Sequence, residues 1–383
     1  MAQMPIETIY LLGAGFSSYA GIPLQKDFAK DILRGGTFGD DQPSRIIVDA
    51  LETFVTKVFH RSSGREDTWP DWEDLFTCVD LSANTGHHLG PRYDPRRLRT
   101  IRRAILSRII RMLEQRYKKA LNDVSKGELL QLLDQFLAAI DLSTSAFVSL
   151  NWDTVLELRL MKQHTNLQFD YGPHVTPARF VSNRDSRITV DGRDPSRRRV
   201  NIAKIHGAIN WLYCDNCRCQ FSFPANRTGS VATQLMQKRD WLTLRPKAKK
   251  HPKSGRWRCS ICGVFLGTRI ATFSYRKVLD SPILSKTWFH AEDLLRRADN
   301  WVFVGYSLPD ADFEFKYMLK RIEVSRPSPP RLFLLDPSKD TVAKYRNFFG
   351  TALPANAIHI GGLGPQAVDH LRRQGIRMAR GKK

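Results

Sequence analysis

The sequence has few of the features that mark membrane or secreted proteins. It contains no apolar stretch long enough to span a bilayer, and its N-terminus shows no basic region followed by an apolar run and a small-residue cleavage site. Only six of its 383 residues are cysteine, and four of these form two Cys-x-x-Cys pairs, so a disulfide framework is poorly supported. We therefore expect a cytoplasmic protein without membrane contact.

Acidic residues are also scarce. The chain has 38 Asp and Glu against 60 Lys and Arg, which gives a formal net charge of +22. Such an excess attracts polyanions or an acidic protein partner, so nucleic acid is one candidate partner. The same balance fits an arginine-rich surface that is simply well solvated, and charge alone does not decide between these interpretations. The length allows one large domain or two ordinary ones with a buried core.

Five apolar runs are typical of buried parallel strands, and each is followed directly by a glycine or a polar residue. The runs are Ile6–Leu12 before Gly13, Phe147–Leu150 before Asn151, Val200–Ile205 before His206, Trp301–Val304 before Gly305 and Leu332–Leu335 before Asp336. In an open parallel α/β sheet, ligands bind just beyond the carboxyl ends of the strands. The sequence therefore predicts an α/β, Rossmann-like sheet with a site along that edge.

The region 42–145 shows a helical pattern. Asp71 stands before acidic residues in the manner of an N-cap, and Pro95–Lys119 carries an apolar stripe with arginines elsewhere. The second pattern predicts an amphipathic helix that is packed on one side and cationic on the other. Three basic segments are expected to be surface loops or a disordered tail: 182–199, 238–258 and 372–383.

Gly13 and Gly15 follow the first predicted strand. Glycines there would let the backbone turn tightly and approach a diphosphate, and the next residues would open a helix whose N–H groups face the anion. A complete dinucleotide fingerprint needs a glycine where this chain has Ser18. From these residues alone, a glycine turn without a ligand is an equally good interpretation.

Four motifs in this order resemble those of the sirtuin family. The run Gly13–Ser17 with Gly21-Ile22-Pro23 resembles the family's cofactor loop. Asn151 and Asp153 match the segment that bears its catalytic Asn and an Asp, and His206 before a glycine matches its catalytic His. Two Cys-x-x-Cys pairs follow, as in the family's structural zinc module. The resemblance covers both ends of the chain, and the region 42–145 contributes little to it.

Two longer stretches are most similar to the bacterial sirtuin-like branch associated with antiphage defence. They are residues 204–211 (KIHGAINW) and 305–310 (GYSLPD). The resemblance implies NAD as the substrate and a sirtuin type of Rossmann-like fold. The residues expected to contact NAD are Gly13, Ala14, Gly15, Phe16, Ser17, Gly305, Ser307 and Asp336.

The chemistry of nicotinamide release suits the matched polar residues. Breaking this glycosidic bond passes through an oxocarbenium-like centre, so the ribose and the leaving group must be held and a nucleophile aimed. An amide such as Asn151 can hold a water and a ribose hydroxyl, the carboxylate of Asp153 can accept from the carboxamide, and His206 can take a proton. Without the resemblance, a helix cap at 151–153 and a buried structural histidine would be preferred.

Asp336 ends the last of the five apolar runs. A carboxylate there could accept from a ribose hydroxyl and disfavour a phosphate, which would favour NAD over NADP. An equally good interpretation is a helix N-cap ahead of Pro337-Ser338.

The two cysteine pairs, Cys214 with Cys217 and Cys259 with Cys262, could supply four thiolates to a tetrahedral structural zinc ion. The 41 residues between the pairs exceed a compact ribbon and imply an inserted basic loop. Cys219 is an alternative ligand. Cys78 stands alone and is expected to be buried.

The chain departs from deacylating sirtuins at the peptide-binding segments. Leu24-Gln25-Lys26 stands where they have Asp-Phe-Arg, and Thr272–Lys277 lacks their Phe-Gly-Glu stretch. The sequence therefore predicts an NAD⁺ hydrolase that serves as an antiphage defence effector. The alternatives are an NAD-dependent protein deacylase or ADP-ribosyltransferase, and an NAD-sensing or nucleic-acid-binding or partner-binding subunit without turnover. We expect gating through a homo-oligomer or a separately encoded protein partner.

The predicted organisation has three units. They are a Rossmann-like NAD-binding domain of residues 1–41, 146–211 and 268–383, a helical insertion of residues 42–145, and a zinc-binding module with a basic loop of residues 212–267.

Overall fold

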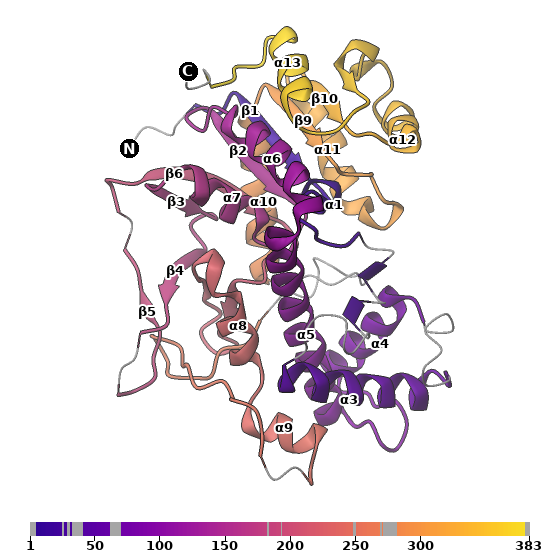
Figure 1. The fold of residues 1–383 in the computed structure, drawn as a ribbon, viewed down its shortest axis with the longest axis vertical. Coiled ribbons are helices and arrows are strands. Elements are labelled where there is room, and N and C mark those ends of the chain that lie inside the picture. Colours follow the sequence, from indigo (N-terminus) through magenta and orange to yellow (C-terminus); the bar gives the residue numbers. More distant parts are fainter. Residues whose placement is uncertain are drawn as a thin grey trace.

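A computed structural model describes residues 5–24, 27–28, 31–32, 41–61, 70–181, 184–192, 194–247, 250–268, 270 and 282–379. Its centre is a seven-stranded sheet in the order β11-β10-β9-β1-β2-β6-β3, in which every pairing is parallel (Figure 1). This confirms the predicted α/β class. The strands are β1 (Thr8–Leu12), β2 (Ser145–Ser149), β3 (Leu167–Asp170), β6 (Arg198–Lys204), β9 (Asn300–Val304), β10 (Arg331–Leu335) and β11 (Ile358–His359).

All five predicted apolar runs form strands of this sheet, namely β1, β2, β6, β9 and β10. Every residue of β1, β2 and β9 is buried, as expected for a parallel sheet covered on both faces. The runs could be recognised in the sequence because strands buried on both faces are almost continuously apolar.

The carboxyl ends of the central strands are in register. Leu12 pairs with Ser149 on one side and with Val304 on the other, and the same level continues to Leu335 and Lys204. Whatever follows these five residues therefore emerges along one edge. The chain leaves β1 toward β2 and later returns to β9 on the opposite side, so a topological switch point lies beside β1.

Most of the described residues between β1 and β2 are helical. Asp41 caps α3 by accepting from the Ser44 N–H at 2.9 Å, and Asp94 caps α5 in the same way. Asp71 holds the predicted N-cap position of α4, but its side chain makes no capping bond. The helices are α1 (Ala14–Ser18), α3 (Gln42–Val58), α4 (Trp72–Thr85), α5 (Pro95–Asn122) and α6 (Val124–Ala138).

Helix α5 differs from the predicted half-buried helix with a cationic face. Arg108 is fully buried and donates to the Ile32 carbonyl at 3.0 Å. Arg103 forms an ion pair with Asp240 of helix α9 (Lys238–Leu244), and the Asp240 side chain is also fully buried. The apolar stripe was predicted correctly, but the arginines join α5 to neighbouring elements rather than forming a free cationic face.

A second sheet, in the order β5-β4-β8-β7, lies beside the cysteine pairs. Its strands are β4 (Val175–Arg179), β5 (Thr189–Val190), β7 (Trp211–Tyr213) and β8 (Gln220–Ser222). The other helices are α7 (Val155–Gln163), α8 (Thr228–Leu235), α9 (Lys238–Leu244), α10 (Pro282–Arg297), α11 (Phe313–Ser325), α12 (Lys339–Phe349) and α13 (Pro365–Arg373). Short 3-10 turns occur at Ala225–Arg227, Asp310–Asp312, Gly350–Ala352 and Ala355–Ala357.

The basic segments are more ordered than predicted. Residues 238–258 begin with α9, residues 182–199 include β5, and residues 372–379 pack, with Met378 bridged to Ile140. Tertiary packing explains these differences, since Ile376 and Trp241 are buried.

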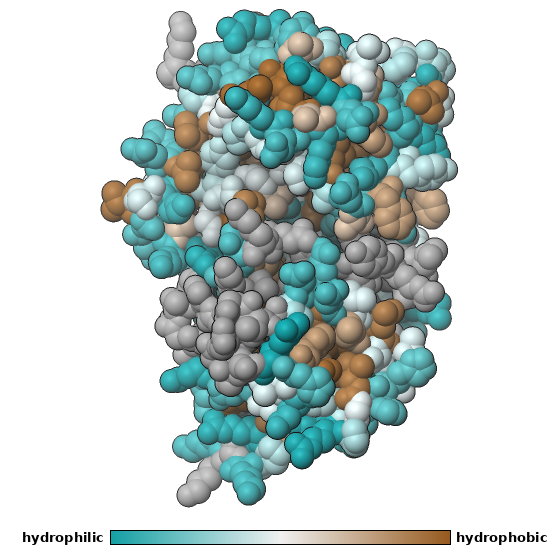
Figure 2. Space-filling model, turned by 90° about the vertical axis from the view of Figure 1, so that its right-hand side faces the viewer, coloured by the Kyte–Doolittle hydropathy of each residue, from teal (hydrophilic) through white to brown (hydrophobic). Residues whose placement is uncertain are grey.

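The face in Figure 2 is largely hydrophilic, with hydrophobic side chains gathered in separate patches. No helix in the described ranges has both the length and the apolar character that crossing a bilayer requires.

Candidate functional site

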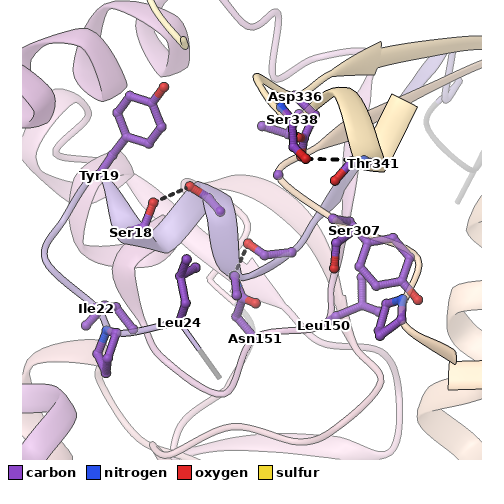
Figure 3. Close-up of a pocket in the computed structure, with 18 of the residues that line it drawn as sticks. Ser18, Tyr19, Ile22, Leu24, Leu150, Asn151, Ser307, Asp336, Ser338 and Thr341 are labelled. Carbon is purple, nitrogen blue, oxygen red and sulfur yellow. Dashed lines mark hydrogen bonds between the residues drawn. The ribbon is translucent and has the colours of Figure 1, made fainter. Parts of the chain in front are cut away.

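A cleft of about 520 Å³ lies along the carboxyl edge of the main sheet (Figure 3). Phe16 and Ser17 are buried behind its wall and do not line it. The other residues predicted for catalysis or NAD contact all do: Gly13, Ala14, Gly15, Asn151, Asp153, His206, Gly305, Ser307 and Asp336. Trp152 contributes to the wall.

The glycines of the cleft lie where two loops cross. A Cβ on Gly15 would come within 2.8 Å of the Gly305 Cα, and a Cβ on Gly13 within 2.5 Å of the Gly305 oxygen. The Gly15 N–H donates to the Gly305 carbonyl at 2.9 Å, and Gly305 has a φ of +58°. Glycine is thus required by backbone contact between the loops. The Gly15 N–H is used within this crossing.

Asn151 ties β2 to the glycine loop. Its Nδ2 donates to the Gly13 carbonyl at 2.7 Å and to the Ser17 hydroxyl at 2.9 Å. Figure 3 shows Asn151 beside the cleft. A carbonyl can only accept, which fixes the orientation of the amide. Both donors are therefore occupied, and Oδ1 is the atom that Asn151 can offer to a ligand. The sequence predicted that the Asn151 amide would both donate to a ligand and accept from it. Only the acceptor, Oδ1, is available for that role.

His206 follows β6 and is buried against the same edge. Its Nδ1 lies 3.0 Å from the Leu150 carbonyl oxygen. Because that oxygen only accepts, we assign the proton of the neutral ring to Nδ1 and the lone pair to Nε2. Nε2 is then the atom of this side chain that can accept a proton.

Asp153 stabilises the turn just ahead of α7. Its Oδ1 accepts from the Val155 N–H at 2.9 Å, but the N-cap of α7 is Thr154, so Asp153 is not the helix cap that the sequence offered as an alternative. The side chain also lines the cleft. One oxygen thus fixes the local turn, and the carboxylate has a second oxygen to offer a carboxamide.

A buried ion pair beneath these residues was not predicted. Lys204 Nζ lies 3.2 Å from Glu157 Oε1, with their side chains only 1% and 0% exposed. Lys204 also donates to the carbonyl of Asp153, and the Tyr171 hydroxyl donates to Glu157 Oε1 at 3.0 Å. Burial raises the pKa of Tyr171 well above its usual value, and the Glu157 charge acts in the same direction. The signal in the sequence was a lysine near the end of the apolar-rich run Val200–Ile205.

Asp336 lies at the other end of the cleft. Its Oδ1 accepts from the Ser338 N–H at 2.9 Å, whereas Ser338 itself caps α12 by accepting from the Thr341 N–H at 3.2 Å. The N-cap of α12 is therefore Ser338 and not Asp336. Burial raises the pKa of the Asp336 carboxyl, and the Ser338 N–H opposes this shift. Figure 3 shows Asp336, Ser338 and Thr341 together beside the cleft.

The helical region also contributes to the cleft, which the sequence did not indicate. Glu73 of α4 and Leu113 of α5 line it. A second cavity of about 160 Å³ adjoins this side and shares Ile22, Leu113 and Asp153 with the cleft. Its other walls come from α5, α7 and the start of α8.

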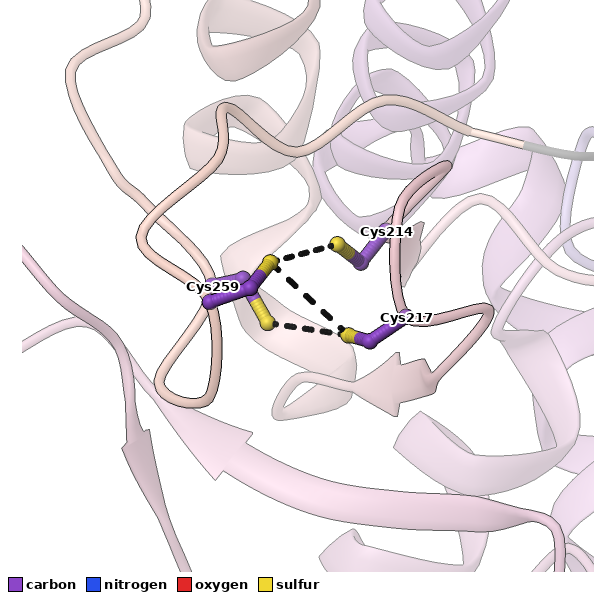
Figure 4. Close-up of side chains that lie close together, drawn as sticks. Cys214, Cys217 and Cys259 are labelled. Carbon is purple, nitrogen blue, oxygen red and sulfur yellow. Dashed lines mark hydrogen bonds between the residues drawn. The ribbon is translucent and has the colours of Figure 1, made fainter.

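The four predicted cysteine ligands converge. One ligand atom from each of Cys214, Cys217, Cys259 and Cys262 lies within 4.8 Å of all the others (Figure 4). Cys219 is outside this group, and its Sγ lies 3.6 Å from the Cys217 carbonyl. Cys78 is half-buried rather than buried, and burial raises its pKa.

The two cysteine pairs have the same backbone turn. Arg218 N–H donates to the Cys214 carbonyl at 2.9 Å, and Gly263 N–H donates to the Cys259 carbonyl at 3.0 Å. Both Arg218 and Gly263 have positive φ. The two turns therefore direct the four cysteine sulfurs toward a common position.

The geometry suits a tetrahedral metal ion. Thiolates 2.3 Å from a zinc ion lie about 3.8 Å apart. The Sγ atoms of Cys214 and Cys262 are 3.3 Å apart, those of Cys217 and Cys259 3.5 Å, and those of Cys262 and Cys217 3.9 Å. The four cysteines can therefore hold one metal ion, and an all-sulfur set favours zinc.

Comparisons with known proteins give little beyond this geometry. No family model matches the chain, and no curated protein matches it. A solved structure titled "The Structural basis of Sirtuin Substrate Affinity" aligns with 96% of this chain and 94% of its own, at 12% identity and a TM-score of 0.39. A likeness at this level says nothing about the activity of this chain.

Proposed function

We propose that this protein is an NAD⁺ hydrolase that releases nicotinamide and ADP-ribose. The observation that carries the proposal is the cleft at the switch point, where the glycine crossing, the Asn151 amide, the His206 ring and Asp336 all face one space. Ligands of parallel α/β sheets bind in such a crevice. The resemblance of the four sequence motifs to the sirtuin family supports NAD as that ligand.

The order of the strands gives the cleft two ends. Asp336 follows β10 and His206 follows β6, with β9, β1 and β2 between them. Strands about 4.8 Å apart make this edge about 19 Å long, enough for an extended dinucleotide. We assign the adenosine half to the Asp336 end and the nicotinamide half to the end with Asp153 and His206.

The reaction we propose uses three side chains. Asp153 accepts from the carboxamide NH₂, and Asn151 Oδ1 accepts from a ribose hydroxyl or the attacking water. The nicotinamide–ribose bond breaks with its electron pair moving to the pyridinium nitrogen, which leaves as neutral nicotinamide. A water oxygen bonds to the anomeric carbon, and its proton passes to His206 Nε2. The cysteine cluster has a structural role, in which a bound zinc ion would hold the two turns together.

Water is the proposed acceptor because the peptide-binding half of the family pattern is missing from the sequence. Leu24 lines the cleft, and it begins the segment that replaces Asp-Phe-Arg. The other altered segment, Thr272–Lys277, lies outside the described residues. The stretches 204–211 and 305–310 support a role as an antiphage defence effector.

Such an enzyme must be restrained until it is needed. We expect a homo-oligomer or a separately encoded partner to gate it, with the region 42–145 as the contact. Turnover per chain that is fast at high dilution and independent of protein concentration would contradict this.

A deacylase is the second candidate, favoured by the smaller cavity. This cavity meets the cleft at Asp153, and its walls include Leu121, Val155 and Leu158, so an apolar chain could enter it. A peptide carrying an acyl-lysine is therefore needed in the test.

The test is quantification of nicotinamide after incubation with NAD⁺, with and without acylated peptide. His206→Gln and Asn151→Ala should abolish product, and His88→Ala, which changes an exposed histidine, should not. Calorimetric titration with NAD⁺ shows whether an inactive variant still binds. Peptide-dependent product would favour the deacylase, and unchanged turnover in His206→Gln would exclude the proposed base.

A further inference from the structure

The zinc module carries a disproportionate share of the net positive charge, because it has few acidic residues. Residues 212–267 contain eleven Lys and Arg but only two acidic residues, Asp215 and Asp240. Asp240 is fully buried in its ion pair with Arg103, so Asp215 is the one acidic side chain that the module exposes. Ten of the eleven cations are described, and all ten are exposed: Arg218, Arg227, Lys238, Arg239, Arg245, Lys247, Lys250, Lys253, Arg256 and Arg258.

Exposed apolar side chains accompany this charge on the second cysteine turn. Ile261 is 62% exposed, Val264 42% and Phe265 40%. The Arg258 guanidinium lies 4.2 Å from the Phe265 ring centroid. The Arg256 guanidinium lies 4.8 Å from the ring of Trp257. Flat cationic groups and rings thus alternate on one short segment.

The backbone of this segment is held firmly. The Gln234 side chain bonds both the N–H and the carbonyl of Trp257, at 2.9 and 2.8 Å. The backbone of Arg258 bonds on the opposite side of the segment. Its N–H donates to the Ser186 carbonyl at 2.8 Å, and its carbonyl accepts from the Ile188 N–H at 2.9 Å. This alternation is that of a paired strand. Arg187, which forms an isolated β-bridge with Arg258, donates to the Ser260 carbonyl at 3.4 Å.

We propose that Arg187, Arg256, Arg258 and Phe265, here called the knuckle face, bind single-stranded nucleic acid. Guanidinium groups neutralise phosphates, and exposed rings and guanidinium planes stack on bases that are not paired. A duplex hides its bases, and a polyanion without bases has nothing to stack on Phe265. The combination of charge with exposed planar groups therefore fits a single strand best.

The test is fluorescence anisotropy with a labelled oligo(dT) of about 20 nucleotides and an abasic strand with the same phosphates. NAD is absent, so the result does not depend on the proposed hydrolase activity. The intact protein should bind oligo(dT) about tenfold more tightly than the abasic strand. Phe265→Ala should remove this preference and keep the affinity for the abasic strand.

Charge reversal tests the cationic part. The double variant Arg256→Glu with Arg258→Glu should weaken binding of both oligonucleotides. In a plot of the logarithm of the binding constant against the logarithm of the salt concentration, its slope should be shallower by about 1.4. The matched control is Lys344→Glu with Arg346→Glu, two exposed residues of α12, which lies at the opposite end of the molecule from α9 (Figure 1). Metal content and melting temperature report whether each variant is folded.

Three results would overturn the proposal. They are equal affinity for oligo(dT) and the abasic strand, equal loss of binding in the α12 control, or duplex DNA binding as tightly as oligo(dT).

Discussion

Lys204 Nζ and Glu157 Oε1 lie 3.2 Å apart at the base of the cleft, where neither side chain reaches solvent. The pair joins the end of β6, which carries His206, to helix α7, which follows Asp153. The two parts of the proposed active site are thus held by one buried interaction. Its function is positional, because neither residue lines the cleft.

Removing one partner of this pair should be costly. Lys204→Met leaves the Glu157 carboxylate buried without its cation, which typically costs about 3–5 kcal/mol. Lys162→Met is the control, because Lys162 is 63% exposed and its pair with Asp134 contributes about 0–1 kcal/mol. Urea unfolding measures both. Similar losses in the two variants would show that the buried pair does not hold the site.

The glycine crossing should not tolerate a methyl group. Gly15→Ala puts a Cβ 2.8 Å from the Gly305 Cα, so the two loops must separate. We expect a loss of about 1–3 kcal/mol in unfolding free energy and of NAD affinity in a titration. Gly127→Ala, within α6 and with no atom within 4 Å of the added Cβ, should be neutral or stabilising. Normal NAD binding by Gly15→Ala would contradict the account.

Asn151 should contribute to stability as well as to chemistry. Asn151→Asp keeps the shape but loses the donor to the buried Gly13 carbonyl, at a cost of about 1–3 kcal/mol. Ser17→Ala removes only the second contact and should cost about 1 kcal/mol with NAD turnover retained. Thermal unfolding measures the loss of stability in both variants, and the nicotinamide assay measures the loss of turnover, so the two effects can be separated. An Asn151→Asp variant as stable as the parent would contradict the assigned orientation of the amide.

The pH dependence of stability should report Asp336. Its pKa in the folded protein is raised by burial, so the folded state holds the proton more tightly than the unfolded state. Stability should therefore fall as pH rises from the ordinary carboxyl pKa of 3.8 through the raised value. Asp336→Asn keeps the acceptor for the Ser338 N–H and should flatten that part of the curve. An unchanged curve would mean that burial does not perturb this carboxyl.

Metal binding should depend on four cysteines and no others. Cys259→Ser should lose metal measured by mass spectrometry and destabilise the zinc module, because structural zinc stabilises the fold that binds it. Cys219→Ser should keep the metal, since its sulfur is directed at the Cys217 carbonyl. Metal retained by Cys259→Ser and lost by Cys219→Ser would reverse the ligand assignment.

The strands and the edge of the cleft were predictable from the sequence because buried parallel strands form almost continuous apolar runs. Their polar successors, such as His206 and Asp336, were found as the residues where the apolar runs stop. The cysteine ligands followed from spacing, and the geometry excludes Cys219 from the cluster.

What sequence reasoning missed depends on contacts between distant segments. Arg108 reads as a surface residue on a helical wheel, but it is fully buried and donates to the carbonyl of Ile32, which is distant in the sequence. Lys204 lies in the KIHGAINW stretch, but the sequence did not predict a role for it, because its partner Glu157 lies on another element. Gly15 was assigned to a phosphate, and only the fold shows Gly305 against it. The division into three units and the roles of the site residues stay predictions.

The most direct test of the central claim is the reaction with NAD⁺ in water enriched in oxygen-18, without peptide, followed by mass spectrometry of the products. The account predicts equal amounts of nicotinamide and ADP-ribose, with the heavy oxygen on the anomeric carbon and no product from His206→Gln. Nicotinamide formed only with an acylated peptide, or ADP-ribose formed by His206→Gln at the normal rate, would contradict it.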